Sequence, residues 1–359
     1  METTIIAIGD PHFKVENLPE VELFIEQIVG LCKEIKPSCI VVLGDVLDTH
    51  ETLHTVPMNK AFELIQKLRD IAFTVVMVGN HDMISNQEFL TTHHWMNSMK
   101  EWNNVLVVDT VVSKKINTHD FIFCPYVYNG RFIEALSTLK EDWKKATCIF
   151  AHQEFIGCKM GAKISDEGDV WNIDYPQIVS GHIHSNQTLN NIYYCGSSLQ
   201  QAFGENDNNI IPVLSWKQGS SVYELKEVNL KLPRKKIIYR DMAAISNFDF
   251  EKEQKNGNKI KLSLSGDKEE FKAFKKTKKY KDIIGSGCKV SFKDKKYFEK
   301  EKAVIALSTN LNTNSENSES DFPSILRELV LLEKNSDLLN MYEYVVNNVV
   351  RKDSEVLFI

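Results

Sequence analysis

A short apolar run that ends in a carboxylate most constrains how this chain can fold. Residues 39–43 are apolar and mostly β-branched, a pattern typical of a strand that is buried on both faces. The run stops at Gly44 and Asp45. Because a charge is not stable inside a buried strand, Asp45 is predicted to lie at the rim of the sheet, where it can meet water or a metal ion.

Four other apolar runs end in residues that can bind metal ions. These runs are 3–8, 73–78, 146–151 and 177–180, and Asp, Asn or His follows each of them at once or after one glycine. Residues that follow parallel strands gather at the carboxyl edge of an open α/β sheet, where functional sites form. The residues predicted at that edge are Asp10, His12, Asp45, Asn80, His81, Asp82, His152, His182 and His184.

The spacing of these residues predicts shared binding sites. Asp10 and His12 are two residues apart, as are His182 and His184. Residues two apart in an extended chain point the same way, so each pair can bind at one place. Carboxylate, imidazole and amide oxygen together suit divalent ions such as Mn, Fe, Mg or Zn. The ligands are too many for one tetrahedral ion, whereas two ions that share a carboxylate would use them all.

The order D-x-H, G-D, G-N-H-D, H and G-H-x-H resembles the calcineurin-like metallophosphoesterase superfamily. The resemblance implies an α/β fold, a four-layer α-β-β-α sandwich, and two divalent ions, with Mn²⁺ first and Mg²⁺, Fe²⁺ or Zn²⁺ as alternatives. It implies one ion bound by Asp10, His12, Asp45 and His184, and a second bound by Asp45, Asn80, His152 and His182. His81 would protonate the leaving oxygen or steady the phosphoryl charge, and Asp82 would orient His81.

The composition is ordinary for a soluble protein of more than one domain. The 359 residues carry a net charge of −6, and no run approaches the roughly 20 apolar residues of a membrane span. No signal segment opens the chain, and the seven scattered cysteines form no C-x-x-C pair. These features predict reduced thiols and a cytoplasmic or nuclear location, without a membrane partner.

Helical spacing of apolar residues predicts helices over 20–36, 57–71 and 86–102. The third range contains His93 and His94, and we favour a structural role for them because adjacent helical residues do not share a face. The resemblance places a possible homodimer contact on 57–71 and 86–102, where apolar residues could form a patch. The same residues are equally consistent with core; they are Phe62, Phe89, Trp95, Met96 and Met99.

Charge divides the chain near residue 231. Residues 231–302 hold 22 Lys and Arg against 11 Asp and Glu, so the rest of the chain carries −17. Such a segment attracts polyanions, although a solvated lysine-rich surface explains it equally well. We predict a phosphoesterase domain over 1–230 and a basic α+β capping domain over 231–307, which would bind DNA.

The C-terminal part changes character twice. Residues 308–320 are polar and biased, as is typical of a linker. Residues 321–359 regain apolar helical spacing and predict a helical pair, whose apolar face must pack on this chain or on a partner.

Features beyond the metal motifs resemble the SbcD-type recombination-repair DNA exonuclease subunit, in its phage and viral forms. The stretch 192–200, followed by Phe203-Gly204-Glu205, looks like the family's I-Y-x-G-S-x-x-Q…F-G-E stretch. The basic segment and the helical pair stand where that family has a capping domain and docks an SMC/ABC-type (SbcC-like) ATPase. The resemblance implies a two-metal nuclease that acts on duplex ends and single strands. The alternatives are an enzyme for small phosphodiesters or phosphoproteins, and a scaffold that recruits an ATPase to DNA ends.

Overall fold

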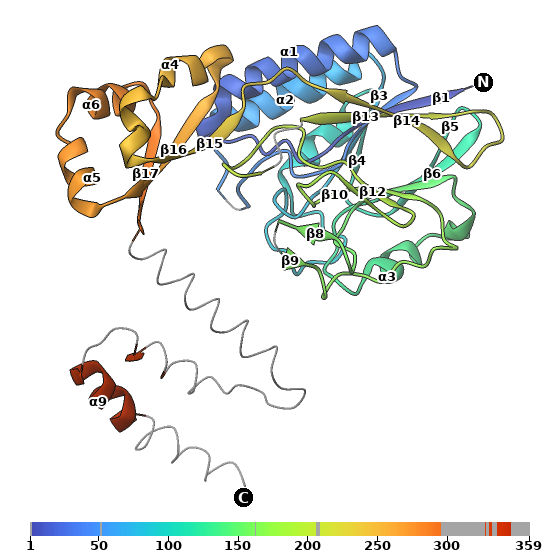
Figure 1. Cartoon of the computed structure of the whole chain (residues 1–359). Coiled ribbons are helices and arrows are strands. Elements are labelled where there is room, and N and C mark those ends of the chain that lie inside the picture. The colour runs from blue at the N-terminus through green and yellow to red at the C-terminus, as the bar shows by residue number, and fades with distance from the viewer. Residues whose placement is uncertain are drawn as a thin grey trace, which may run out of the picture. The chain divides into compact units, whose positions relative to one another are not determined.

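The computed structural model describes residues 2–50, 52–161, 163–205, 209–295, 327, 330–331 and 336–345, apart from the side chains at 246, 247, 256, 336 and 345. The chain divides into two compact units (Figure 1). The first unit comprises Met1–Ile237 and Glu251–Ile260, and the second comprises Ile238–Phe250 and Lys261–Ile359. Within the described residues, no helix is both long enough and apolar enough to span a bilayer.

The first unit contains two six-stranded sheets. In spatial order, the first sheet consists of β14 (Tyr223–Asn229), β13 (Ile210–Trp216), β1 (Thr3–Ile8), β2 (Cys39–Val42), β3 (Phe73–Met77) and β4 (Val105–Val108). Strands β1 to β4 are parallel, with Ile8 opposite Val42 and Val42 opposite Val76. Strands β13 and β14 are antiparallel and close one side of the sheet.

The second sheet also has a parallel centre. Its spatial order is β11 (Gln187–Leu189), β12 (Ile192–Tyr194), β10 (Ile178–Gly181), β7 (Cys148–His152), β6 (His119–Cys124) and β5 (Val112–Ile116). Strands β12, β10, β7 and β6 are parallel, and β11 and β5 form antiparallel edges. The carboxyl ends of β7 and β10 therefore lie side by side, with Gly181 opposite His152.

Three apolar clusters make the first unit a four-layer α-β-β-α sandwich, as predicted. A central cluster joins the two sheets through residues such as Val41, Met77 and Phe150. The outer face of the first sheet is covered by α1 (Leu18–Ile35) and α2 (Thr55–Arg69), whereas α3 (Phe132–Leu136) packs on the second sheet. Because β1 to β3, β7 and β10 are covered on both faces, their near-continuous apolar sequences are explained.

The predicted helix over 86–102 is wrong for most of its length. Only η2 (Trp95–Glu101) is helical, as a 3₁₀-helix, and the His94 ring accepts a hydrogen bond from the Met96 amide at its start. Leu90 has φ +48°, which no right-handed helix permits. Met96 and Met99 are fully buried in the core of this chain, so they offer no exposed patch to a second copy.

Several edge elements lack a pattern that predicts them. The hairpin β8 (Lys159–Met160) and β9 (Lys163–Ile164) is short and polar, as is β5. The remaining 3₁₀ turns of the first unit are η1 (Val15–Asn17), η3 (Trp143–Lys145) and η5 (Lys255–Gly257). All seven cysteines are free and buried.

The chain beyond the sandwich forms a three-stranded sheet with short helices. The sheet order is β15 (Lys235–Asp241), β16 (Lys259–Gly266) and β17 (Lys289–Asp294). The short helices are η4 (Met242–Asn247), α4 (Phe250–Glu253), α5 (Lys268–Phe274) and α6 (Lys278–Gly285). Helices α5 and α6 are separate because Thr277 begins a new helix, where its hydroxyl accepts the Tyr280 amide.

The small unit has its own core, to which Leu262, Leu264 and Ile283 contribute fully buried side chains. The rings of Phe271 and Phe292 stack with centroids 4.3 Å apart. The predicted linker 308–320 lies outside the described residues, and so does most of 321–359. In that range the structure describes α9 (Ser336–Val345). The predicted domain boundaries at 230, 307 and 320 stay predictions.

Candidate two-metal site

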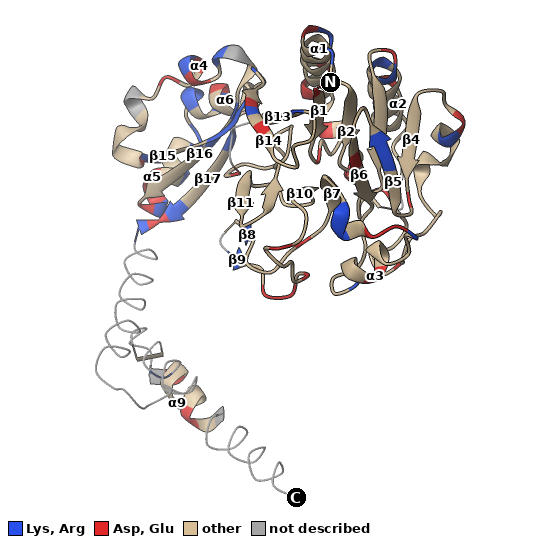
Figure 2. Cartoon of the chain, turned by 90° about the vertical axis from the view of Figure 1, so that its right-hand side faces the viewer, with Lys and Arg blue, Asp and Glu red and all other residues tan. Residues whose placement is uncertain are grey.

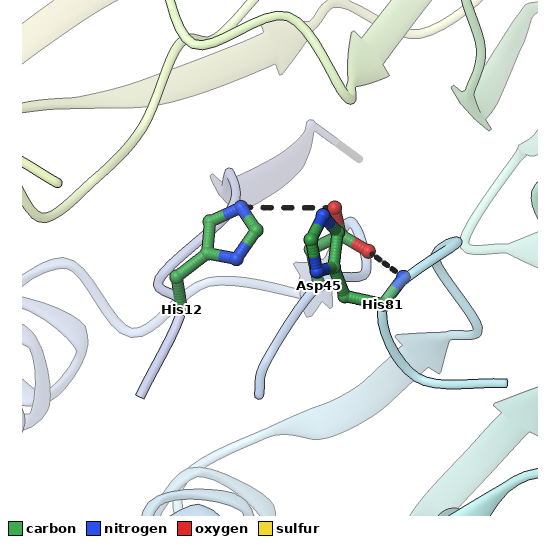
Figure 3. A group of neighbouring side chains, drawn as sticks. All are labelled: His12, Asp45 and His81. Carbon is green, nitrogen blue, oxygen red and sulfur yellow. Dashed lines mark hydrogen bonds and ion pairs between the residues drawn. The ribbon is translucent and has the colours of Figure 1, made fainter. Parts of the chain in front are cut away.

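The predicted ligands follow strands of both sheets and meet above the sheet edges. Asp10 follows β1, Asp45 follows β2 and Asn80 follows β3 in the first sheet. His152 ends β7 and His182 follows β10 in the second sheet. Figure 3 shows His12, Asp45 and His81, whose side chains come from separate loops of the first sheet. Both sheets therefore contribute to one site.

One group of ligand atoms surrounds Nε2 of His152. This nitrogen lies 3.2 Å from Oδ2 of Asp45 and 3.1 Å from Oδ1 of Asn80. The same Asn80 oxygen lies 2.8 Å from Nδ1 of His182. Asp45, His152 and His182 offer ligand atoms that all lie within 4.8 Å of one another, as a single bound ion requires.

A second group surrounds Nε2 of His12. This nitrogen lies 3.1 Å from Nε2 of His184 and 3.7 Å from Oδ2 of Asp45. His12, Asp45 and His81 form the second set of ligand atoms within 4.8 Å (Figure 3). Asp45 belongs to both groups and faces each with the same oxygen, so it occupies the position of a bridging carboxylate.

Asp10 lies behind the two groups and is completely buried. Its Oδ1 accepts a hydrogen bond from the His182 amide at 2.8 Å and lies 3.6 Å from Nδ1 of His152. Its Oδ2 is buried and has no hydrogen-bond partner. A buried carboxylate oxygen without a partner is costly, and a cation would satisfy it. The donor set and this orphaned oxygen both fit divalent metal ions.

The backbone at the site is strained. Asp10, His12, Asp45 and His182 have φ values of 38°, 45°, 49° and 75°. Residues other than glycine rarely adopt such values, and each costs about 1–3 kcal/mol. Packing in the surrounding sandwich compensates for this free energy of strain and fixes the direction of four predicted ligands.

Outer hydrogen bonds fix the histidine rings. Nδ1 of His152 donates to the Leu43 carbonyl at 2.7 Å, which leaves Nε2 for the site. Nδ1 of His184 lies 3.4 Å from Oε1 of Glu205, which leaves its Nε2 facing His12. Outer partners of this kind orient metal-binding histidines in proteins.

His81 is held differently from the expectation. Its Nδ1 donates to the Asp48 carbonyl at 2.7 Å, and its ring stacks on His50 with centroids 4.4 Å apart. Its amide donates to Oδ1 of Asp45 at 2.8 Å. Asp82 does not orient this ring. It instead accepts hydrogen bonds from the Gly79 and Leu47 amides and from the Trp95 indole, and so fixes the loops.

The pKa values reflect close packing of charges. Burial lowers the pKa of His182 to about 3 and also lowers that of His12, so both rings are neutral at pH 7, the state that binds metal. Burial would also lower the pKa of His152, but the charge and hydrogen bond of Asp45 raise it to about 9. Burial would raise the pKa of Asp45, but His152 and His12 hold it below its usual range. A positive charge beside Asp45 is therefore strongly favoured.

Three residues of the site were not singled out by sequence reasoning: Asp48, Glu205 and Tyr126. Tyr126 packs its ring 5.5 Å from that of His182. Glu205 belongs to the F-G-E stretch that was quoted without a role. His94, for which a structural role was predicted, lies outside the site and binds Asp109. His119 also lies outside the site and binds Thr3 in the interior.

Residues 3–186 match the family described as Calcineurin-like phosphoesterase. The chain belongs to this family. Two viral proteins carry related sequences. The "Putative phosphoesterase 078R" of Invertebrate iridescent virus 3 is 43% identical over 82% of this chain and 85% of that protein. "Putative phosphoesterase 244L" of Invertebrate iridescent virus 6 is 43% identical over 76% of this chain and 98% of that protein.

A solved dimetal phosphatase from Danio rerio overlaps 64% of this chain and 99% of its own length, with 8% identity and a TM-score of 0.36. The family assignment rests on the sequence matches and needs no support from that likeness. The chain is therefore a metal-dependent phosphoesterase, a hydrolase with the dimetal site typical of its family. The assignment of individual residues to each ion stays a prediction.

Proposed function

We propose that this phosphoesterase is a DNA nuclease that works with an SMC/ABC-type ATPase in recombination, repair or replication. The main support is a contact between the F-G-E stretch and the predicted metal site. Glu205 faces His184 and also accepts the amides of Gln201 and Ala202 at 2.8 and 2.9 Å. The stretch by which the chain resembles SbcD-type nucleases thus orients a predicted metal ligand.

When bound, the metal ions would supply a Lewis acid and a water of lowered pKa. The chain's own residues would do the rest. Nδ1 of His81 donates to the Asp48 carbonyl, which leaves Nε2 outside that contact. When the ring carries both protons as an imidazolium, Nε2 can give its proton to the leaving oxygen. The neutral rings of His12 and His182 and the carboxylate of Asp45 would hold the ions.

Positive charge on the second unit supports a polyanionic substrate. Helices α5 and α6 and the turn between them carry six exposed lysines and the half-buried Lys279. The exposed ones are Lys268, Lys272, Lys275, Lys276, Lys278 and Lys281. Lysine and arginine are blue in Figure 2. Phosphate contacts supply much of the affinity for nucleic acids, and they weaken as salt rises.

Exposed apolar residues on α9 support a protein partner. Leu338, Met341 and Tyr344 recur every three residues and are 39%, 65% and 68% exposed. Such a stripe suits a groove on another protein. We propose the ATPase as the occupant. A homodimer through α2 and the segment 86–102 stays a second partner prediction. Met96 and Met99 would not belong to its interface, because they are buried in the core.

A gel assay with linear duplex and circular single-stranded DNA tests the nuclease. We expect cleavage with Mn²⁺ and none with EDTA. If the protein hydrolyses p-nitrophenyl phosphate or a phosphopeptide but leaves DNA intact, the nuclease proposal is wrong and the family assignment stands.

Charge variants test the basic helices. Lys275, Lys276 and Lys278 changed together to Gln should weaken DNA binding and flatten its salt dependence. Lys115, Lys140 and Lys145 are exposed on the first unit and serve as the matched triple control. Equal loss in both triples would contradict a specific role for α5 and α6. Deletion of 321–359 should leave DNA cleavage intact and remove binding of the ATPase.

A further inference from the structure

A cavity of about 690 Å³ opens beside His50, next to the predicted catalytic histidine. Its lining includes His50, Leu53, Met83, Ile84, Thr92 and Trp95. The connection to the site is direct, because the His50 ring stacks on that of His81, with 22° between the planes. The His50 ring therefore connects the cavity to the predicted catalytic histidine, which does not itself line the cavity.

Hydrogen bonds between buried groups hold the wall of the cavity in place. Asp82 is buried beneath it and ties together the Leu47 amide and the Trp95 indole. His94 is buried and binds Asp109 at 3.1 Å. The Ile84 amide donates to the His93 carbonyl at 3.2 Å, which fixes the two sides of the cavity to each other.

The surface of the cavity is largely apolar and aromatic, with polar groups at its rim. Leu53 and Ile84 are 43% and 45% exposed, so their side chains meet solvent. Thr92 and Asn97 also line the cavity, and the Asn97 amide donates to the Thr92 carbonyl at 2.6 Å. Apolar and aromatic side chains beside polar ones suit an aromatic heterocycle, and cavities of about 300–1,000 Å³ are typical of small ligands.

We propose that this cavity is a subsite for one unpaired nucleobase of the DNA strand that is cut. The inference rests on the proposed nuclease function. A duplex cannot enter a space of this size, so the base must leave the stack, which costs least at frayed ends and in single strands. The subsite would therefore favour unpaired DNA over intact duplex.

Binding of the base can be measured without metal or cleavage. Saturation-transfer NMR with thymidine and EDTA-treated full-length protein should transfer saturation to the base protons. The variant Ile84→Trp fills the cavity and should abolish the transfer. Ile133→Trp is the matched control, because Ile133 is 38% exposed on α3 and does not line the cavity. Leu53→Trp fills the cavity from another residue if Ile84→Trp does not fold.

A cleavage assay with modified oligonucleotides tests whether the cavity contributes to the reaction. An oligonucleotide with an abasic residue at the cut position should be cut less efficiently by the wild-type protein, by about 5- to 150-fold in kcat/KM, the range of base stacking. The Ile84→Trp variant should cut both oligonucleotides equally. Transfer that survives in Ile84→Trp, or no penalty for the abasic substrate, overturns the subsite. Base binding without any DNA cleavage would instead overturn the nuclease function and keep the subsite.

Discussion

Individual residues at the metal site are held in place by their neighbours' backbone. The ring of His81 is oriented by a carbonyl and by His50, and its amide is bound to Asp45. Removal of the ring leaves the amide, so the bridging carboxylate should keep its position.

The variant His81→Ala should therefore lose catalysis and keep metal. We expect DNA or phosphoester cleavage to fall by about 10²- to 10⁴-fold, the usual contribution of a general acid. The metal content by mass spectrometry should be unchanged. His54→Ala, an exposed histidine outside the cavity lining, is the control. Loss of metal in His81→Ala would show that the ring is a ligand.

Gly79 packs against Asp45, the predicted bridging carboxylate. A Cβ at this position would overlap both Oδ1 and the backbone nitrogen of Asp45. Gly79→Ala should destabilise the protein by about 1–3 kcal/mol, as overpacking does, and lower its metal content. Gly30→Ala in α1 meets nothing within 4 Å and should stabilise by about 0.5–1 kcal/mol instead. Urea unfolding compares the two, and equal effects would contradict the packing argument.

Elements differ in how far the sequence predicts them. The buried strands β1, β2, β3, β7 and β10 are visible as apolar runs, and the metal motifs follow from their carboxyl ends. The edge strand β5 reads Val-Ser-Lys-Lys-Ile and is half exposed, so its sequence carries no burial pattern. Phe89 and Met96 are seven residues apart, which is a helical spacing, but residues 86–94 form turns and bends rather than a helix.

The site shows the same limit. Asp10, Asp45 and His152 were predicted because they end strands, whereas the Asp48 and Glu205 contacts depend on loops that meet only in the folded chain. The contact of Glu205 with His184 could not be predicted in this way, because Glu205 does not directly follow a strand. Asp82 was expected to orient His81 because the two are adjacent in sequence. Their side chains instead bind different partners, the Trp95 indole for Asp82 and the Asp48 carbonyl for His81.

Lys235, the first residue of β15, forms hydrogen bonds with the loop that carries Glu205. Nζ of Lys235 donates to the carbonyls of Gln200 and Gln201 at 2.6 and 2.8 Å. Burial lowers the pKa of this lysine to about 8, from 10.5 in the unfolded chain. Between these values the unfolded state holds a proton that the folded state lacks, so this lysine makes stability rise with pH across that window.

The variant Lys235→Met should remove that rise. Because Lys235 is only half-buried, we expect the effect to stay below about 2 kcal/mol. Urea unfolding at pH 8 and pH 10 measures it, with Lys231→Met, an exposed lysine nearby, as the control. The same pH slope in Lys235→Met and wild type would contradict the assignment.

At the scale of the molecule, the metal centre joins the two sheets of the first unit. Asp10, Asp45 and Asn80 extend from one sheet, and His152 and His182 extend from the other. An ion bound to both should stabilise the sandwich against separation of its sheets.

Saturating Mn²⁺ should therefore raise the melting temperature, and EDTA should reverse the change. An ion present at 100 times its Kd stabilises the folded state by about 2.7 kcal/mol. The variant Asp45→Asn lacks the shared carboxylate and should show a much smaller shift by calorimetry. An undiminished shift in Asp45→Asn would place the ion elsewhere.

All seven cysteines are buried, so the rate at which they are alkylated reports local opening of the fold. Burial raises the pKa of Cys39 and Cys148, so native thiols should resist alkylation until the surrounding layers part. Six of the thiols belong to the first unit and Cys288 to the second. Mass spectrometry after timed iodoacetamide labelling should therefore give a separate opening rate for each unit. Rapid labelling of all seven in the native protein would contradict the packing described above.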